Sequence, residues 1–124
     1  VTRDSNPQDP SQLSVRRLES NSTLESYETI YLNAWQRQVE TTGYFQISQK
    51  DILKGNFKVQ IRSIIDSMGN LIGADILKSS GNSSMDALAL KILQQAAPFE
   101  PFPVDMAANY QQLEIIRDWN FTNS

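Results

Sequence analysis

Acidic side chains are the main candidates for chemistry in this sequence, because it contains no cysteine and no histidine. Without these residue types it has no thiol nucleophile, no Ser-His-Asp triad, no disulfide and no ordinary zinc site. Catalysis by paired carboxylates is what remains. The acidic residues Asp66, Asp75, Asp86, Glu100 and Asp105 show no motif spacing, and a turn and a helix start account for Asp66 and Asp86. The sequence therefore predicts that the protein is not an enzyme.

Sites for other ligands are equally unsupported. Residues 66–70, DSMGN, lack the pattern of a calcium loop, so we predict no metal site and no cofactor. The net charge is −3 and the basic residues are scattered, which argues against nucleic-acid binding. No stretch approaches the roughly 18 apolar residues that cross a bilayer. We expect neither a nucleic acid nor a small-molecule substrate, and protein partners remain.

The first element that could position a binding surface is a helix over residues 22–42. Ser22 and Glu25 have the spacing of a capping box, and Gly43 supplies a C-terminal stop. Residues 44–56 follow as a connector. Apolar residues, three of them aromatic, recur at helical intervals and predict a face in the core: Leu24, Tyr27, Ile30, Tyr31, Ala34, Trp35 and Val39.

Two strands follow, joined by a turn in which Gly69 is free to adopt a positive φ. The second strand spans residues 71–78, with Ile72, Ala74 and Ile76 on one face and a bulge expected near Gly73. The first strand shows the period of two that is typical of a sheet with one buried face. Its inward residues are Phe57, Val59, Ile61 and Ile65.

The second helix has the clearest amphipathic pattern in the chain. Ser83 or Ser84 is the expected cap, and Pro98 ends the helix. The segment PFEPFP at residues 98–103 is either a recognition motif or a spacer, and its two phenylalanines favour a spacer packed onto the domain. The apolar face of the helix consists of Met85, Leu88, Ala89, Ile92, Leu93 and Ala96.

The last strand covers residues 112–121. Leu113, Ile115, Trp119 and Phe121 share one face with Arg117, and Glu114, Ile116, Asp118 and Asn120 lie on the other. Arg117 either lays its stem on apolar surface or pairs with a carboxylate such as Asp86 or Asp105.

These elements occur in the order α-β-β-α-β. They predict an α+β fold of two layers, with helices packed on one face of a three-stranded antiparallel sheet. Residues 1–21 are polar and rich in Ser, Asn and Pro, so we predict a flexible N-terminal arm there and a domain over residues 22–124.

Residues 27–121 resemble the C-terminal domain of the TonB family. The resemblance rests on an ordered set of motifs: Gly55-x-Phe57-x-Val59-x-Ile61, Asp66-x-x-Gly69-x-Leu71, Met85-Asp86-x-x-Ala89, Pro98-Phe99-x-Pro101-Phe102-Pro103 and Leu113-x-Ile115-x-Arg117-x-Trp119-x-Phe121, preceded by Tyr31-x-x-x-Trp35. Two positions depart from the family pattern. No Tyr-Pro pair follows Gly43, and Arg117-Asp118-Trp119 replaces Arg-Thr-Trp, which leaves the identity of the partner open.

The resemblance implies a periplasmic energy-transducer domain, tethered to the inner membrane by an N-terminal segment absent from this chain. An ExbB–ExbD-like motor would act through regions outside the chain. The domain would bind the TonB box of an outer-membrane TonB-dependent transporter as a strand added beside the last strand. That role falls on Gln112, Leu113, Glu114, Ile115, Ile116, Arg117, Asp118, Trp119, Asn120 and Phe121.

Three expectations accompany this assignment. Tyr44, Phe45 and Gln46 form a second candidate partner surface, because they occupy the place of the missing Tyr-Pro pair. An exposed edge strand could also pair with a second copy, which predicts a weak homodimer. The alternative function is a TolA-like or other periplasmic scaffold domain with the same fold and different envelope partners.

Overall fold

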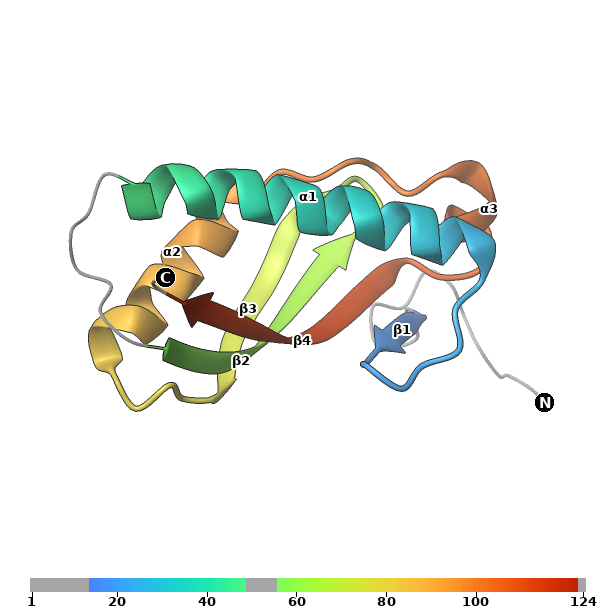
Figure 1. Ribbon diagram of the computed structural model, residues 1–124. Helices are drawn as coiled ribbons and strands as arrows, with labels where there is room; N and C mark the ends of the chain where they lie inside the picture. Colours follow the sequence, from blue (N-terminus) through green and yellow to red (C-terminus); the bar gives the residue numbers. More distant parts are fainter. Residues whose placement is uncertain (1–13, 49–55, 123–124) are drawn as a thin grey trace.

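A computed structural model describes residues 14–48 and 56–122, and the side chains of residues 45–48 and 122 are not described. A single sheet runs through it, in the strand order β1-β4-β2-β3 (Figure 1). The strands β2, β3 and β4 pair antiparallel, and β1 joins β4 in parallel. The elements are β1 (Val15–Leu18), α1 (Ser26–Ser48), β2 (Asn56–Asp66), β3 (Leu71–Lys78), α2 (Ser83–Ala96), α3 (Val104–Ala107) and β4 (Gln112–Thr122).

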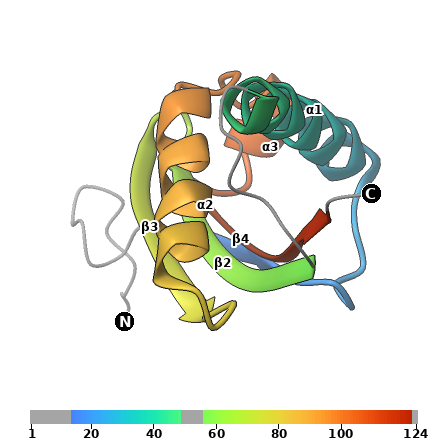
Figure 2. The ribbon, with the colours of Figure 1, turned by 60° about the vertical axis from the view of Figure 1, so that its left-hand side comes forward.

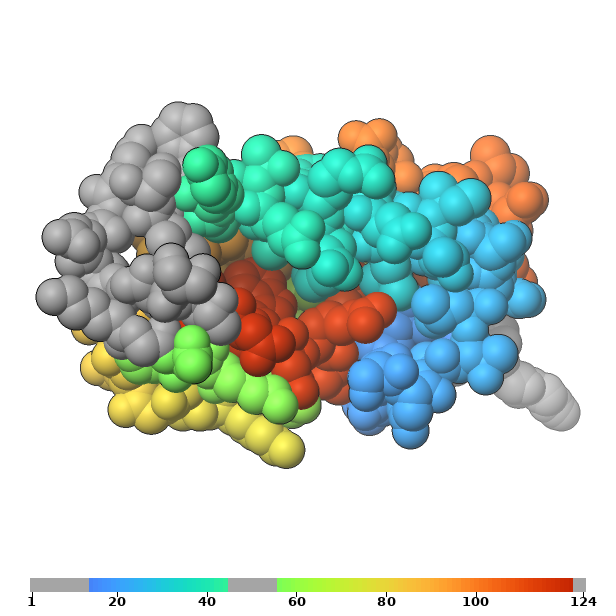
Figure 3. All heavy atoms as spheres, in the orientation of Figure 1, coloured from blue at the N-terminus to red at the C-terminus, as the bar shows by residue number. Residues whose placement is uncertain are grey.

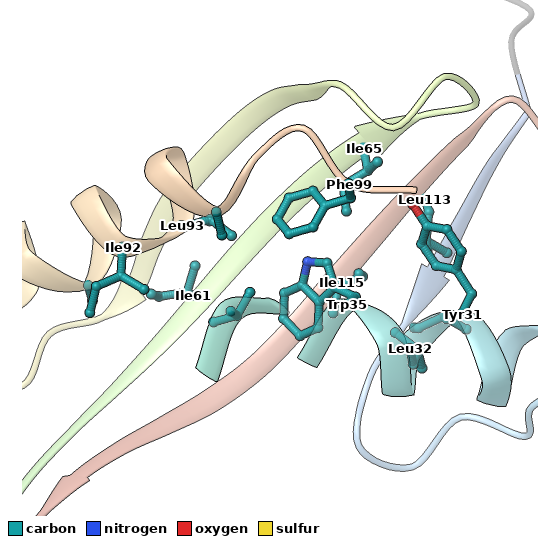
Figure 4. Packing of buried hydrophobic residues seen from close by; sticks show 14 of the residues in the cluster. Tyr31, Leu32, Trp35, Ile61, Ile65, Ile92, Leu93, Phe99, Leu113 and Ile115 are labelled. Carbon is teal, nitrogen blue, oxygen red and sulfur yellow. The ribbon is translucent and has the colours of Figure 1, made fainter. Parts of the chain in front are cut away.

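The predicted α+β class is confirmed, with one strand more than expected. The long helices α1 and α2 lie on the same side of the curved sheet (Figure 2). Between helices and sheet is a core in which Trp35 and Phe99 meet Ile115 and Leu113 of β4 (Figure 4). All six apolar residues predicted for the inner face of α2 are buried. Burying such side chains contributes about 1.5–3 kcal/mol each, so packing on the sheet stabilises α2.

The hairpin of β2 and β3 follows the predicted pattern with one correction. The register between the strands shifts at Ile64/Ile65, so that Ile64 faces Gly73 and Ile65 faces Leu71. The bulge near Gly73 is thereby confirmed. Because the bulge inserts one residue, it turns Ile72 outward, where it is 50% exposed, and Leu71 packs against the core instead.

Both predicted ends of α1 are wrong. The helix begins at Ser26, and the Glu28 carboxylate accepts a hydrogen bond from the Glu25 N–H (2.8 Å). The expected cap, Ser22, instead accepts from the Glu19 N–H in the preceding turn. Gly43 does not stop the helix, which continues to Ser48, and Gly43 packs against Ile92 of α2. The cap of α2 is Asn82 rather than Ser83 or Ser84, since its Oδ1 accepts from two amides of the first turn.

The Pro-Phe segment after α2 is a packed spacer, as predicted from its phenylalanines. Phe99 and Phe102 are both buried, and their N–H groups donate to the Gly69 and Ser67 carbonyls in the β2–β3 turn (2.8 and 2.9 Å). Gly69 has φ +92°, and a Cβ there would lie 2.1 Å from the Phe99 carbonyl oxygen. The turn therefore requires glycine. The Tyr31 hydroxyl donates to the Glu100 carbonyl (2.7 Å) and ties α1 to the same segment.

Candidate partner-binding edge

The outer edge of β4 is covered over only part of its length. The Gln112 N–H donates to the Ser14 carbonyl (3.1 Å), so the main-chain groups of even-numbered residues in β4 face away from β2. Strand β1 pairs with residues 112–115. Among the described strands, none pairs with this edge beyond Ile115, although β2 pairs with the other side along all of β4. Because the parallel pairing extends to Leu18 and Ile115, the Ile116 N–H still faces the Leu18 carbonyl. The Ile116 carbonyl and the outward-facing groups of Asp118 and Asn120 are therefore open.

We call residues 112–115 the covered half of β4 and residues 116–122 the open half. In the space-filling view the red residues of the open half reach the surface between α1 and the green β2 residues, and the blue residues of β1 lie beside the covered half (Figure 3). The expectation that all of residues 112–121 form a free edge is thus wrong for the covered half. It was based on a flexible arm, and the structure places residues 15–18 of that arm in the sheet.

An ion pair between a partly exposed arginine and a buried carboxylate holds β1 on the helix side of the sheet. The guanidinium of Arg16 donates to both carboxylate oxygens of Glu28 on α1 (2.9 and 3.2 Å). Glu28 is 1% exposed and also accepts from the Tyr110 hydroxyl (2.7 Å) and the Glu25 N–H. Burial alone would raise the pKa of Glu28, but these hydrogen bonds outweigh it and lower the pKa below its ordinary value. Next along β1, Leu18 is fully buried.

Charged side chains also cross the outer face of the sheet and fix β1 from that side. Arg17 of β1 lies 3.4 Å from Glu114 of β4, and Arg62 of β2 lies 3.9 Å from the same carboxylate. Arg62 in turn pairs with Asp75 of β3. The four residues connect all four strands. Side chains of β1 thus make contacts on both faces of the sheet, and these contacts hold β1 beside the covered half.

A groove of about 490 Å³ lies between α1 and the open half. Six residues of α1 form one wall, and residues 117–121 of β4 form the other, with Ile92 of α2 contributing. Tyr44, which was predicted as part of a second partner surface, is 78% exposed and lines this groove. The last strand and Tyr44, which were predicted as two separate partner surfaces, therefore line the same groove. Phe45 and Gln46 follow in α1, but their side chains lie outside the described residues.

Two hydrogen-bond donors in the groove walls have no acceptor in the described part of the chain. They are Nε1 of Trp35 and Nε of Arg117, both buried. The predicted pairing of Arg117 with Asp86 or Asp105 is not found within residues 14–48 and 56–122. Asp86 instead accepts from the Ser80 N–H (2.9 Å) and from the Ser79 and Ser80 hydroxyls. A buried donor without an acceptor costs about 1–3 kcal/mol, so these two atoms favour an external acceptor.

The predicted site residues fall into three groups. Gln112 pairs with Val15 of β1, and Leu113, Glu114 and Ile115 are buried beneath or beside β1. Ile116, Asp118 and Asn120 carry the open main-chain groups. The odd-numbered residues of the open half face the helices, and Arg117, Trp119 and Phe121 line the groove.

The sequence analysis missed β1, because its residues VRRL show no apolar alternation: Val15 is exposed, and the inward positions are the charged Arg16 and the apolar Leu18. It assigned Trp35 to the core alone, whereas Trp35 belongs to both the core and the groove wall.

Within residues 14–48 and 56–122, no helix is both long and apolar enough to cross a membrane. No group of three or more acidic side chains in the same ranges could hold a metal ion. The candidate site is therefore an edge with an adjoining groove, built from main-chain groups, aromatic rings and one arginine.

Comparison with known proteins gives one family and a fold. The family model described as Gram-negative bacterial TonB protein C-terminal matches residues 44–122. Among solved structures, TolAIII bound to a peptide derived from the N-terminus of TolB has a TM-score of 0.55 at 13% identity, covering 85% of this chain and 82% of that one. The HasB CTD has a TM-score of 0.47 at 17% identity, covering 82% and 78%. No curated protein matches the chain.

Proposed function

Because the chain belongs to the family of Gram-negative bacterial TonB protein C-terminal domains, we propose that it binds the TonB box of an outer-membrane transporter by adding that peptide as a strand to the open half of β4. The family is a periplasmic protein-interaction domain of energy transducers, and this coarser assignment holds for the chain. What we propose beyond it is that the partner is a transporter, that the peptide binds by strand addition, and that a motor drives the domain.

The single observation that carries the proposal is the unfinished edge of β4. Between Ile116 and Thr122 the strand is paired to β2 on one side only. A row of outward-facing N–H and C=O groups is a template for an extended peptide, and backbone pairing supplies affinity with little dependence on sequence. Strand β1 supports a parallel arrangement, because it pairs with the same edge in parallel immediately before the open half begins.

The arrangement also suits a protein that transmits force. Ladder hydrogen bonds run perpendicular to the strands, so a pull along the peptide loads them in shear and several must break together. Strand β4 is joined to the central strand β2 over its whole length, from Gln112 to Thr122. A load on the added strand would thus pass directly into the middle of the sheet. An ExbB–ExbD-like motor would supply that load through an inner-membrane tether outside this chain.

The alternative function is a TolA-like scaffold with other envelope partners. The observation that favours it is the fold similarity to TolAIII, a protein described with a bound peptide from the N-terminus of TolB. Both functions would present the open half to an extended N-terminal peptide. They differ in which protein supplies that peptide, so the identity of the peptide that binds separates them.

An NMR titration of the ¹⁵N-labelled domain tests the proposal. Probes are synthetic peptides copied from the N-termini of outer-membrane transporters, and of soluble envelope proteins, from the same genome. We expect one transporter peptide to shift the amides of Ile116, Asp118 and Asn120, whereas a scrambled copy does not. Shifts with a peptide from a soluble protein alone would favour the scaffold.

Two N-methylated copies of the binding peptide make the test specific for strand addition. Methyl groups on the amides that face β4 should abolish binding, because those amides can no longer donate. Methyl groups shifted by one residue leave the same amides free and should preserve it. If the two copies bind equally well, or if the amides of the open half do not shift, strand addition is wrong.

A further inference from the structure

We propose that β1 is a mechanical clamp, which carries a pull on the N-terminal side of the chain directly into β4. This inference deepens the proposed function and rests on it for the source of the load, because β4 is also the strand to which the partner peptide would be added. The clamp itself needs no partner, so its strength can be measured on the chain alone.

Strands β1 and β4 lie side by side and run in the same direction. Val15 pairs with Gln112 and Leu18 pairs with Ile115, and the two arrows point the same way in Figure 1. The chain enters the sheet at the N-terminal end of β1 and leaves β4 at Thr122. A pull on the two ends of the chain therefore draws β1 backwards and β4 forwards along a common axis. The hydrogen bonds between the strands are loaded in shear and must break together.

A peptide added to the open half would be pulled in the sense opposite to β1. In the parallel arrangement its C-terminal end leaves the sheet near Thr122, and the rest of the transporter follows that end. Strand β1 lies on the same edge and is pulled from its N-terminal end. The two loads act along one edge in opposite directions and meet in β4, which β2 supports over its whole length. The helices lie outside this direct path.

Main-chain hydrogen bonds hold both ends of β1. At the entry, the Ser14 carbonyl accepts from the N–H groups of Gln111 and Gln112 (3.1 Å each). At the exit, the chain reverses in a turn where the Ser22 N–H donates to the Glu19 carbonyl (3.1 Å) and the Ser22 hydroxyl accepts from the Glu19 N–H (2.8 Å). A pull on β1 must therefore break bonds at its entry and draw a closed turn along behind it.

Side chains of β1 oppose sliding along β4. The Arg16 guanidinium donates to the Glu28 carboxylate and also to the Thr23 carbonyl (2.7 Å), so it links β1 to α1 and to the segment before it. Leu18 is fully buried. A slip by one residue would exchange the two faces of the strand, placing Arg17 inside and Leu18 outside. The register of β1 is therefore fixed by contacts that a slip must break all at once.

Without β1, the same pull would reach the folded domain where α1 begins, at Ser26. It would then act across the interface between α1 and the sheet and lift the helix away turn by turn. With β1 in place, the load enters a strand that is bonded along its length to β4. The position of β1 thus protects α1 from the load.

Single-molecule pulling of the whole chain in two geometries tests the clamp. In the shear geometry the chain is held by its N-terminus and its C-terminus. In the peeling geometry it is held by its N-terminus and by the thiol of Gln111→Cys, which is unique because the chain contains no cysteine. Gln111 is exposed and lies directly before β4, so this pull separates the two strands from one end. We expect the first rupture in the shear geometry to need about twofold more force or greater, because its bonds break together.

The length of chain released in the first event is a second readout. If β1 bears the load, the first event in the shear geometry unfolds the domain as a whole. If β1 yields first, a weak event releases only residues 14–25, which is roughly 40 Å at about 3.6 Å per residue. Such a weak first event, or equal rupture forces in the two geometries, would overturn the clamp.

Matched variants assign the resistance to the contacts of β1. Arg16→Met removes the bonds to Glu28 and Thr23 and should lower the rupture force in the shear geometry. Arg17→Gln, on the same strand but with a side chain that is 58% exposed, should leave it nearly unchanged. Leu93→Ala removes a fully buried side chain of α2 and should lower the stability in urea without removing the difference between the geometries.

The outcomes separate the clamp from general stability. If Leu93→Ala lowers the shear force as much as Arg16→Met does at the same loss of stability, the force reports the whole domain and the clamp is wrong. If Arg16→Met does not fold, the two geometries of the wild-type sequence decide alone.

The outcomes also separate the clamp from the proposed function. A shear force above the peeling force, in a domain that binds no transporter peptide, would support the clamp and overturn strand addition. Peptide binding at the open half with equal forces in the two geometries would leave strand addition intact and overturn the clamp.

Discussion

The covered and open halves of β4 belong to one strand, pair with the same β2 on one side, and differ on the other. In the covered half, main-chain groups pair with β1, and Arg16 and Arg17 meet carboxylates on opposite faces of the sheet. In the open half, even-numbered residues present free main-chain groups, and two buried donors nearby have no acceptor in the described residues.

This difference cannot come from strand propensity, because both halves have the same conformation and the same pairing to β2. It comes from what lies beside them. Four residues of β1 complete the first half, and the chain then turns away at Ser20 and Asn21. Binding sites are commonly less stable than the rest of a protein, because a sheet edge can bind a partner strand only if its main-chain groups are unpaired. The comparison predicts that substitutions of the residues that hold β1 on the covered half lower the stability of the domain. It also predicts that substitution of Arg117 in the open half raises it.

Removing the carboxylate beneath β1 should have the largest effect. Glu28→Ala leaves Arg16, Tyr110 and the first turn of α1 without their shared acceptor. Leaving these donors without their acceptor lowers the free energy of unfolding by about 3–5 kcal/mol in total, at about 1–3 kcal/mol for each buried donor, which urea denaturation measures. If β1 detaches, hydrogen exchange at Gln112 and Glu114 should become as fast as at Asp118, and the covered half would become a second open half.

Arg17→Gln is the control for that experiment. Arg17 also pairs with a carboxylate from β1, but its side chain is 58% exposed. Exposed ion pairs contribute about 0–1 kcal/mol, so this variant should stay within about 1 kcal/mol of the wild type. A Glu28→Ala domain as stable as Arg17→Gln would mean that β1 is not held by the buried pair.

The apolar anchor of β1 should give the second largest effect. The side chain of Leu18 is fully buried in the core, with 0% of it exposed to solvent. Leu18→Ala should lower the free energy of unfolding by about 3 kcal/mol, because it removes buried methyl groups and leaves a cavity. Val15→Ala, on the same strand at a 50% exposed position, should change it by less than about 0.5 kcal/mol. Equal effects of the two substitutions would show that β1 packs only loosely on β4.

Acid should weaken the covered half. The pKa of Glu28 is lowered in the folded state, so its contribution to stability is complete above the unfolded pKa and is lost as pH falls through the folded pKa. Asp66 and Asp86 have lowered pKa values as well, held by hydrogen bonds in a turn and a loop. Urea denaturation at a series of acidic pH values should therefore show falling stability, with a shallower fall in Glu28→Gln. Identical slopes would contradict the assignment to Glu28.

The sequence predicted the elements that bury a periodic face and missed those that depend on distant partners. Period alone identified the buried residues of α2 and the hairpin with its bulge near Gly73. In contrast, β1 has four residues in a polar arm, and its partner strand β4 and Tyr110 lie far along the chain. No local window contains that information.

The candidate site was predictable to the same extent. The last strand was identified from its alternation, and its role as an edge came from the family resemblance. The division at Ile115 could not be seen without β1, and the groove could not be seen because Gly43 was expected to end the helix that carries Tyr44. Arg117 stood out in the sequence as the polar residue on an apolar face, and only the structure shows its Nε buried without an acceptor.

The smallest predicted effect has the opposite sign. Arg117→Met keeps an apolar side chain that extends to the position of Nε and removes the buried donor, so the domain should become more stable by about 1 kcal/mol. Urea denaturation measures this change, and Arg16→Met on the covered half is the matched control, which should lose stability because Glu28 is left without its cation. A destabilised Arg117→Met domain would mean that the guanidinium is already satisfied in the free protein, and the contrast between the two halves would then rest on the main chain alone.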